Sequence, residues 1–275
     1  MTEPRSRYVA WSDCTFHDYV DIFHDRNKFR ETDLDRIEQA EAAWLKRADR
    51  VLFSTRWAAD RAIAAYGLNP SRVETTGIFG EVALPDDDHY AGAKEFGFIA
   101  TNFAAKGGHA VLAAFRRLRE KRPDVVLSII GERPADVRDE PGISFLGFLR
   151  KEVPNEYQTY CQALGRMRSL VHPTLSDIAP LVVVEADYYG CPVIASRRFG
   201  IPELVEHERT GLLLDDPSDP AAIANAMMWM LEDEGRYREM RRATWLAARQ
   251  RHSKQHYSDR LCAIIRAACS AAAVR

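Results

Sequence analysis

Val125-Val126-Leu127-Ser128-Ile129-Ile130-Gly131 is a continuous apolar stretch that ends at a glycine. A strand of this kind is expected where helices cover both faces of a parallel sheet. Further strands are predicted around it, with helical segments between them, at residues 96–100, 143–146, 169–171, 192–195 and 211–214. This alternation predicts an α/β fold with a Rossmann-like, doubly wound parallel sheet, which binds ligands at the carboxyl ends of its strands.

A second and shorter pattern precedes this sheet. A strand is predicted at 51–54, a helix at 57–66 that Gly67 is well placed to end, and another strand at 73–79. A further helix is predicted to start near Thr32, whereas residues 8–30 carry many aromatics with little periodicity. These elements make one β-α-β unit rather than a complete domain.

The composition excludes several classes of protein. With 38 Lys and Arg against 40 Asp and Glu, the chain is no bulk electrostatic binder of nucleic acid. Its five cysteines form no Cys-x-x-Cys pair and its histidines are scattered, so neither a zinc site nor a disulfide framework is expected. No apolar signal core follows Met1 and no run approaches the length of a membrane span, which favours a cytoplasmic protein.

The most informative stretch for chemistry is Ser176-Asp177-Ile178-Ala179-Pro180-Leu181-Val182-Val183-Val184-Glu185. Asp177 is expected in a loop and Glu185 on the following helix, with Pro180 in the first helical turn. The free N–H groups of Leu181 and Val182 would face an anion such as a phosphate. A ligand at this helix N-terminus could therefore meet both carboxylates.

At this point the sequence resembles glycosyltransferase family 4, whose members have the GT-B fold. The family carries two acids separated by seven residues, then a Glu-Ala helix, a glycine and a Pro-Val-Ile-Ala strand. The matching residues here are Asp177, Glu185-Ala186, Gly190 and Pro192-Val193-Ile194-Ala195. The resemblance is specific over about residues 165–220, and it extends more loosely to nearly the whole chain.

The resemblance implies a role for each of several residues. Glu185 would hydrogen-bond the ribose hydroxyls of a nucleotide-diphosphate sugar, and Asp177 would bind hydroxyls of the donor sugar. Lys106, which follows the first strand of the domain, would contact the diphosphate, and Gly147-Phe148 would lie against the base. The implied reaction is a retaining transfer to a saccharide or lipid-linked acceptor, with the nucleotide sugar as co-substrate and no metal or other cofactor.

The chain departs from the family pattern in three respects. Thr101 stands five residues before Lys106, where the family usually has an arginine, so one of two diphosphate cations is missing. The first acid is Asp177 rather than the commoner glutamate. The strands and Gly-rich loop that start the family's N-terminal domain are also absent, which predicts an N-terminally truncated member.

The resemblance and the element pattern together predict three segments. Residues 1–85 would be a remnant of the acceptor-side domain with the start of a connector, and 86–251 the donor-binding Rossmann-like domain. Residues 252–275 would be a helix that crosses back toward the remnant. Because one β-α-β unit cannot cover both faces of a parallel sheet, exposed apolar surface and self-association are expected.

Some assignments remain open between two interpretations. His172 ends a strand and could line the pocket, but a packed, non-catalytic histidine is the favoured interpretation. The run that contains Arg236, Arg238, Arg241 and Arg242 is interpreted as a solvated face, with peripheral membrane contact as the weaker alternative. For the whole chain, the rivals are a non-catalytic nucleotide-sugar-binding protein or partner subunit, and another GT-B enzyme such as a sugar epimerase or a phosphorylase. A dinucleotide oxidoreductase is disfavoured because no Gly-x-Gly-x-x-Gly follows any strand.

Overall fold

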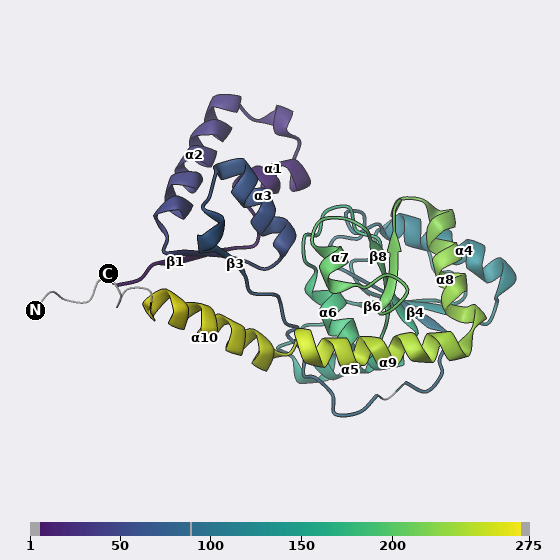
Figure 1. Ribbon diagram of the computed structural model, residues 1–275. Helices are drawn as coiled ribbons and strands as arrows, with labels where there is room; N and C mark the ends of the chain where they lie inside the picture. Colours follow the sequence, from purple (N-terminus) through teal and green to yellow (C-terminus); the bar gives the residue numbers. More distant parts are fainter. Residues whose placement is uncertain (1–5, 89, 271–275) are drawn as a thin grey trace, which may run out of the picture. The chain divides into compact units, whose positions relative to one another are not determined.

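The computed structural model describes residues 6–88 and 90–270, and the chain divides into two compact units (Figure 1). One unit combines the chain up to Ile78 with the segment that begins at Lys254, and the other runs from Phe79 to Ser253. Each unit is built around its own parallel sheet. The α/β fold predicted from the alternation of strands and helices is confirmed.

The sheet of the larger unit has six parallel strands in the order β6-β5-β4-β7-β8-β9. The strands are β4 (Glu95–Ala100), β5 (Val126–Gly131), β6 (Ile143–Gly147), β7 (Ser169–His172), β8 (Val193–Ser196) and β9 (Gly211–Leu214). The chain adds strands in one direction from β4 to β6 and in the opposite direction from β7 to β9. The order therefore reverses between β4 and β7, and a sheet of this kind binds its ligand beside such a reversal.

Helices follow the strands of the larger unit and supply its core. They are α4 (Gly108–Lys121), α5 (Pro154–Arg166), α6 (Leu181–Tyr188), α7 (Ile201–Leu204), α8 (Pro220–Glu232) and α9 (Glu234–Arg251). One apolar face of α4 is buried, with Val111, Leu112, Phe115 and Leu118 each at most 2% exposed. These side chains share a cluster with Met227 of α8 and Leu127 of β5. The apolar stripe of α4 thus holds that helix against the sheet.

The smaller unit contains a three-stranded parallel sheet in the order β1-β2-β3. Its strands are β1 (Val9–Ser12), β2 (Arg50–Phe53) and β3 (Val73–Thr75). Its helices are α1 (Phe16–Phe23), α2 (Glu31–Arg47), α3 (Arg56–Tyr66) and α10 (Lys254–Ser270), with short 3-10 turns at Arg26–Lys28 and Pro70–Arg72. The third strand ends at Thr75 instead of reaching residue 79 as predicted.

A buried cluster and a glycine cap explain how helices α2 and α3 are placed in the smaller unit. Leu45 of α2, Phe53 of β2 and Ala58 of α3 belong to one buried cluster. Gly67 ends α3 in the left-handed conformation, at φ 58°, as its position predicted.

No helix within residues 6–88 and 90–270 is both long and apolar enough to cross a membrane.

The segment 79–94 of the larger unit forms no helix or strand in its described residues, yet it is docked by hydrogen bonds. Gly80 N–H donates to the Tyr188 hydroxyl at 2.9 Å, and Ala83 N–H donates to the Tyr157 hydroxyl at 2.8 Å. Arg241 of α9 binds both carboxylate oxygens of Asp88, at 2.6 and 2.7 Å. Because the Arg241 side chain is only 3% exposed, its assignment to a solvated arginine face was wrong.

Candidate functional site

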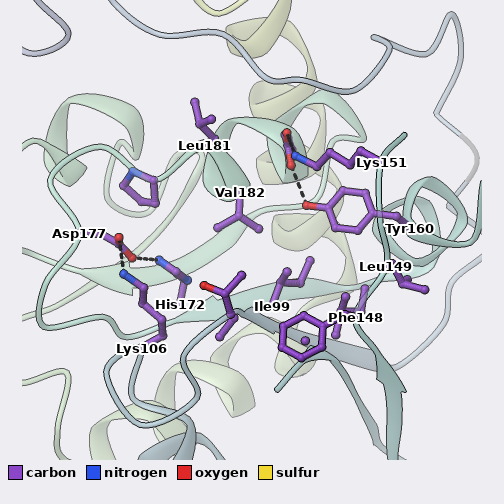
Figure 2. Close-up of a pocket in the computed structure, with 16 residues that line it drawn as sticks. Ile99, Lys106, Phe148, Leu149, Lys151, Tyr160, His172, Asp177, Leu181 and Val182 are labelled. Carbon is purple, nitrogen blue, oxygen red and sulfur yellow. Dashed lines mark hydrogen bonds and ion pairs between the residues drawn. The ribbon is translucent and has the colours of Figure 1, made fainter. Parts of the chain in front are cut away.

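A cavity of about 430 Å³ lies where the strand order of the larger unit reverses (Figure 2). Its wall includes Ala100 at the end of β4, Gly131 at the end of β5 and His172 at the end of β7. Nine of the residues assigned to the site from the sequence line this cavity: Thr101, Lys106, Phe148, His172, Asp177, Pro180, Leu181, Val182 and Glu185. Gly147 does not line it, although the next residue does.

The start of α6 supplies backbone donors to the cavity. Pro180 is the N-cap residue, at φ −69°, so it stands just before the first turn instead of within it as expected. The helix begins at Leu181, and the Val183 N–H donates to the Pro180 carbonyl at 3.2 Å. The first N–H groups of a helix lack partners within it, and Leu181 and Val182 both line the cavity. This arrangement suits an anion at the helix N-terminus.

Lys106 is presented by the loop between β4 and α4. It lies two residues before the first residue of α4, Gly108. Gly107 is the N-cap at φ 82°, and a Cβ there would come 2.7 Å from the Pro173 carbonyl oxygen. The bend that follows Lys106 therefore depends on glycine. Thr101, directly after β4, contributes no charge to the same wall.

Asp177 lies between two nitrogen donors, as Figure 2 shows. Lys106 Nζ is 2.5 Å from its Oδ1, and His172 Nε2 is 2.9 Å from its Oδ2. Burial alone would raise the pKa of Asp177, but His172 and Lys106 outweigh burial and hold that pKa well below its usual range. Asp177 is therefore an ionised hydrogen-bond acceptor at the edge of the cavity.

His172 is buried, with its side chain 2% exposed. Its Nδ1 has no hydrogen-bond partner among the residues that the structure describes. Because the ring meets a carboxylate at Nε2, the histidine is more than an apolar packing residue. It fixes one oxygen of Asp177 and leaves the orientation of that carboxylate well defined.

Glu185, on α6, is 1% exposed and accepts three hydrogen bonds. Its Oε1 accepts from the Glu81 N–H at 3.0 Å and from Lys151 Nζ at 2.5 Å. Its Oε2 accepts from the Tyr160 hydroxyl at 2.6 Å. Burial and the neighbouring Glu185 raise the pKa of Tyr160, so the phenol keeps its proton and donates it.

Lys151 and Tyr160 are site residues that the sequence interpretation missed. Both line the cavity, and the Lys151 ammonium lies 5.3 Å from the centre of the Tyr160 ring. The only sequence signal for Lys151 was its position three residues after Phe148, inside the charged run Arg150-Lys151-Glu152. Such a run is usually a solvated loop, and nothing local shows that it meets α6.

The end of the cavity near β6 is apolar and open. Gly147 ends the strand at φ 71°, a conformation that glycine adopts without strain. Phe148 follows it, lines the cavity and is 59% exposed. A large aromatic ring exposed at a pocket mouth offers a flat surface to a planar ligand.

The charged residues of the cavity wall balance one another. Lys106 pairs with Asp177, and Lys151 pairs with Glu185. Carboxylates of this kind accept hydrogen bonds from hydroxyl groups, whereas ammonium groups and helix N–H groups bind phosphate oxygens. Within residues 6–88 and 90–270, no group of three or more His, Cys, Asp or Glu side chains could hold a metal ion.

Comparison with known sequences gives a match over this same part of the chain. The family of glycosyl transferases group 1 matches residues 85–249. The D-inositol 3-phosphate glycosyltransferase of Corynebacterium urealyticum is 32% identical over 155 residues, which are 52% of this chain and 36% of the relative. That of Thermobifida fusca is 28% identical and aligns with 73% of this chain and 51% of its own length. The chain thus spans about half or less of these curated relatives.

Solved structures are similar in fold. Alr3699/HepE from Anabaena, in complex with UDP, aligns with 96% of this chain and 73% of its own at a TM-score of 0.73 and 20% identity. Sucrose-phosphate synthase from Thermosynechococcus elongatus aligns with 98% of this chain and 69% of its own at a TM-score of 0.70 and 19% identity. At such low identity, these likenesses establish the fold, which is that of GT-B glycosyltransferases.

Proposed function

Because the chain belongs to the glycosyl transferases group 1 family, we propose that its cavity binds a nucleotide-diphosphate sugar for transfer to an acceptor. The observation that carries the proposal is the placement of Asp177 and Glu185 in one cavity, on either side of the start of α6. Two carboxylates and an anion-binding helix end match a ligand with two hydroxyl-bearing rings joined by phosphates. The UDP bound by Alr3699/HepE, a protein of similar fold, supports this class of ligand.

We assign the parts of the donor by their chemistry. The diphosphate would lie at Lys106 and the N–H groups of α6, because an ammonium and the positive end of a helix dipole both attract phosphate oxygens beside Asp177. The donor sugar would donate hydroxyl hydrogen bonds to Asp177, and the ribose to Glu185. The base would lie against Phe148, at the open end of the cavity.

In the proposed reaction, the bond between the sugar anomeric carbon and the diphosphate oxygen breaks, and the diphosphate keeps the bonding electrons. The acceptor hydroxyl forms the new bond to that carbon, and its proton passes to the departing diphosphate oxygen. Lys106 and the α6 N–H groups stabilise the charge that grows on the diphosphate, which is where fixed dipoles lower a barrier most. We propose, from the resemblance, that the anomeric configuration is retained and that no metal takes part.

The test is binding and turnover with a panel of donors. UDP, ADP and GDP and their glucose conjugates would be titrated by calorimetry, and release of free nucleotide would be followed with and without added acceptor sugars. Micromolar binding of one nucleotide with turnover supports the proposal. No binding of any nucleotide would rule it out.

The second candidate is a protein that holds a nucleotide sugar without transferring it. The uncharged Thr101, where the family usually has a cation, favours this alternative. The same panel separates the two functions, since binding with neither transfer nor hydrolysis of any donor would support the binding protein.

A further inference from the structure

The two lysines of the cavity are each paired with one of its carboxylates. In the view of Figure 2, Lys106 lies at one end of the drawn site and Lys151 at the other, with Leu181 and Val182 of α6 between them. Lys106 meets Asp177 and Lys151 meets Glu185, each at 2.5 Å. In this state, each lysine of the cavity wall must leave its carboxylate before its ammonium group can bind a ligand.

The three donors on Glu185 differ in how readily they can leave. The Glu81 N–H belongs to the backbone of the docked segment 79–94, whose Gly80 is held by Tyr188. The Tyr160 hydroxyl sits on a side chain that is only 4% exposed. Lys151 is different, because its side chain is 30% exposed and its ammonium ends a flexible four-carbon stem. Lys151 is therefore the movable donor.

A ribose needs more hydrogen-bond acceptor positions on Glu185 than are free while Lys151 is bound to that carboxylate. An ionised carboxylate has about four acceptor positions, and three are taken here. Two ribose hydroxyls that donate together require two positions. The second becomes free when Lys151 leaves Oε1. The lysine then keeps only the Glu81 carboxylate, which lies 3.3 Å from its ammonium and is 62% exposed. Such a solvated partner holds an ammonium weakly and leaves it free to bind a phosphate oxygen.

We propose that Lys151 is a resting counter-ion of Glu185 that transfers to the diphosphate when a nucleotide binds. The inference rests on the proposed function and adds a residue to it. The ribose hydroxyls replace the ammonium on Glu185, and the ammonium takes a phosphate oxygen near the start of α6. Lys151 thereby supplies, from the loop after β6, the second cation that Thr101 does not supply after β4.

This exchange makes phosphate binding depend on the ribose. Pyrophosphate alone would draw Lys151 away from a buried carboxylate and leave that charge without a cation, which is costly. A nucleoside diphosphate avoids this cost because its hydroxyls take over Glu185. The site would therefore select nucleotides over inorganic polyphosphates, although both carry the same charged group.

The experiment compares a nucleotide with its nucleoside in wild type and in Lys151→Met. UDP, ADP and GDP are titrated by calorimetry, and the nucleoside of the tightest one, together with pyrophosphate, is titrated by ligand-observed NMR. The variant should bind the nucleoside diphosphate about ten- to a hundredfold more weakly and with a shallower salt dependence. Its affinity for the nucleoside should be equal or higher, because the competitor for Glu185 is gone.

Controls separate the proposal from trivial causes. Lys94→Met removes a lysine that is also paired with a carboxylate, Asp124, but lies outside the cavity, and it should bind all ligands as wild type does. If Lys151→Met does not fold, Lys151→Met combined with Glu185→Gln removes both charges. That double variant should still show a lower ratio of diphosphate to nucleoside affinity than the single variant Glu185→Gln.

Several outcomes would overturn the inference. Equal losses for nucleoside and nucleoside diphosphate would mean that Lys151 stays on Glu185 and acts only through it. Unchanged affinity for the diphosphate would remove Lys151 from the phosphate site. Failure of wild type to bind any of the three nucleotides would instead defeat the proposed function itself, so the two failures are distinguishable.

Discussion

The Nε2 atom of His172 lies 2.9 Å from Oδ2 of Asp177, and the other oxygen of that carboxylate faces Lys106. We predict that His172→Leu frees one side of Asp177 and weakens binding of a nucleotide sugar about tenfold. The matching nucleoside diphosphate, which has no sugar for Asp177 to bind, should be affected much less. Calorimetry with both ligands measures the difference, and equal losses would show a general structural effect.

The same contact has a consequence for acid titration. His172 and Lys106 hold the pKa of Asp177 well below its usual range, so the carboxylate should stay ionised under mildly acidic conditions. In His172→Leu the first of these two contributions is lost, and the pKa of Asp177 should rise. An NMR titration of the Asp177 carboxyl carbon checks this. An unmoved titration midpoint would contradict the assigned contact.

Glu185 is predicted to be essential for nucleotide binding. Glu185→Gln keeps the shape of the side chain but removes its charge, and hydrogen bonds to a charged group contribute about 1.5–3 kcal/mol. The affinity for the nucleoside diphosphate should fall about ten- to a hundredfold in calorimetry. Glu232→Gln, at the exposed end of α8, is the matched control and should leave the affinity unchanged.

Transfer is predicted to need no divalent metal. The charges that would stabilise the leaving diphosphate are those of Lys106 and the α6 N–H groups. Turnover of the tightest donor should therefore persist after treatment with a chelator. Activity that disappears with the chelator and returns with Mg²⁺ or Mn²⁺ would refute the prediction.

Asp187 on α6 gives a prediction about stability and pH. Its side chain is buried, Oδ1 has no partner among the described residues, and burial raises its pKa well above 3.8. The folded state then holds this proton at a pH where the unfolded state has lost it. The free energy of unfolding must therefore fall as pH rises from the unfolded pKa through the folded one.

The test replaces that ionisable group. Urea unfolding between about pH 5 and pH 8 should show that Asp187→Asn gains stability relative to wild type as pH rises. Asp136→Asn, on an exposed loop, should run parallel to wild type. Parallel curves for all three proteins would mean that the Asp187 carboxyl is solvated when charged.

Substitutions of Arg241 and of its neighbour Arg242 test how much the contacts of segment 79–94 stabilise the fold. Arg241→Ala removes a buried guanidinium that binds Asp88 at two points and the Tyr189 carbonyl at 2.7 Å. It should lower the free energy of unfolding by more than about 2 kcal/mol. Arg242→Ala, next to it but exposed, should change that free energy by less than about 0.5 kcal/mol. Denaturant titration of both variants decides.

The sheet and most of the cavity could be predicted because their signals are local. The continuous apolar run of β5 requires helices on both faces of the sheet. Asp177 and Glu185 are only eight residues apart, and α6 begins between them, so both carboxylates lie near the start of one helix. Once strands and helices alternate, the reversal of strand order is the expected ligand site. Thr101 and His172 then fall at strand ends that flank that reversal.

The missed features depend on contacts between distant residues. Lys151 belongs to a charged run, and only its meeting with Glu185, 34 residues away, gives it a role. Arg241 lies in an arginine-rich helix and is buried because Asp88, 153 residues away, pairs with it. The strand Val9–Ser12 and the helix Phe16–Phe23 are too short for a hydrophobic period to show.

The way the two units share the chain has a practical consequence. Residues 79–253 are one uninterrupted polypeptide that carries every cavity residue, so this unit can be encoded by a single gene fragment. The other unit is assembled from both ends of the described chain. Its last helix, α10, buries Ile264 and Ala268, and its Arg260 binds Thr75 at 2.8 Å. Deleting residues 254–270 would therefore destabilise the smaller unit, including the three-stranded sheet formed by residues far away in the sequence.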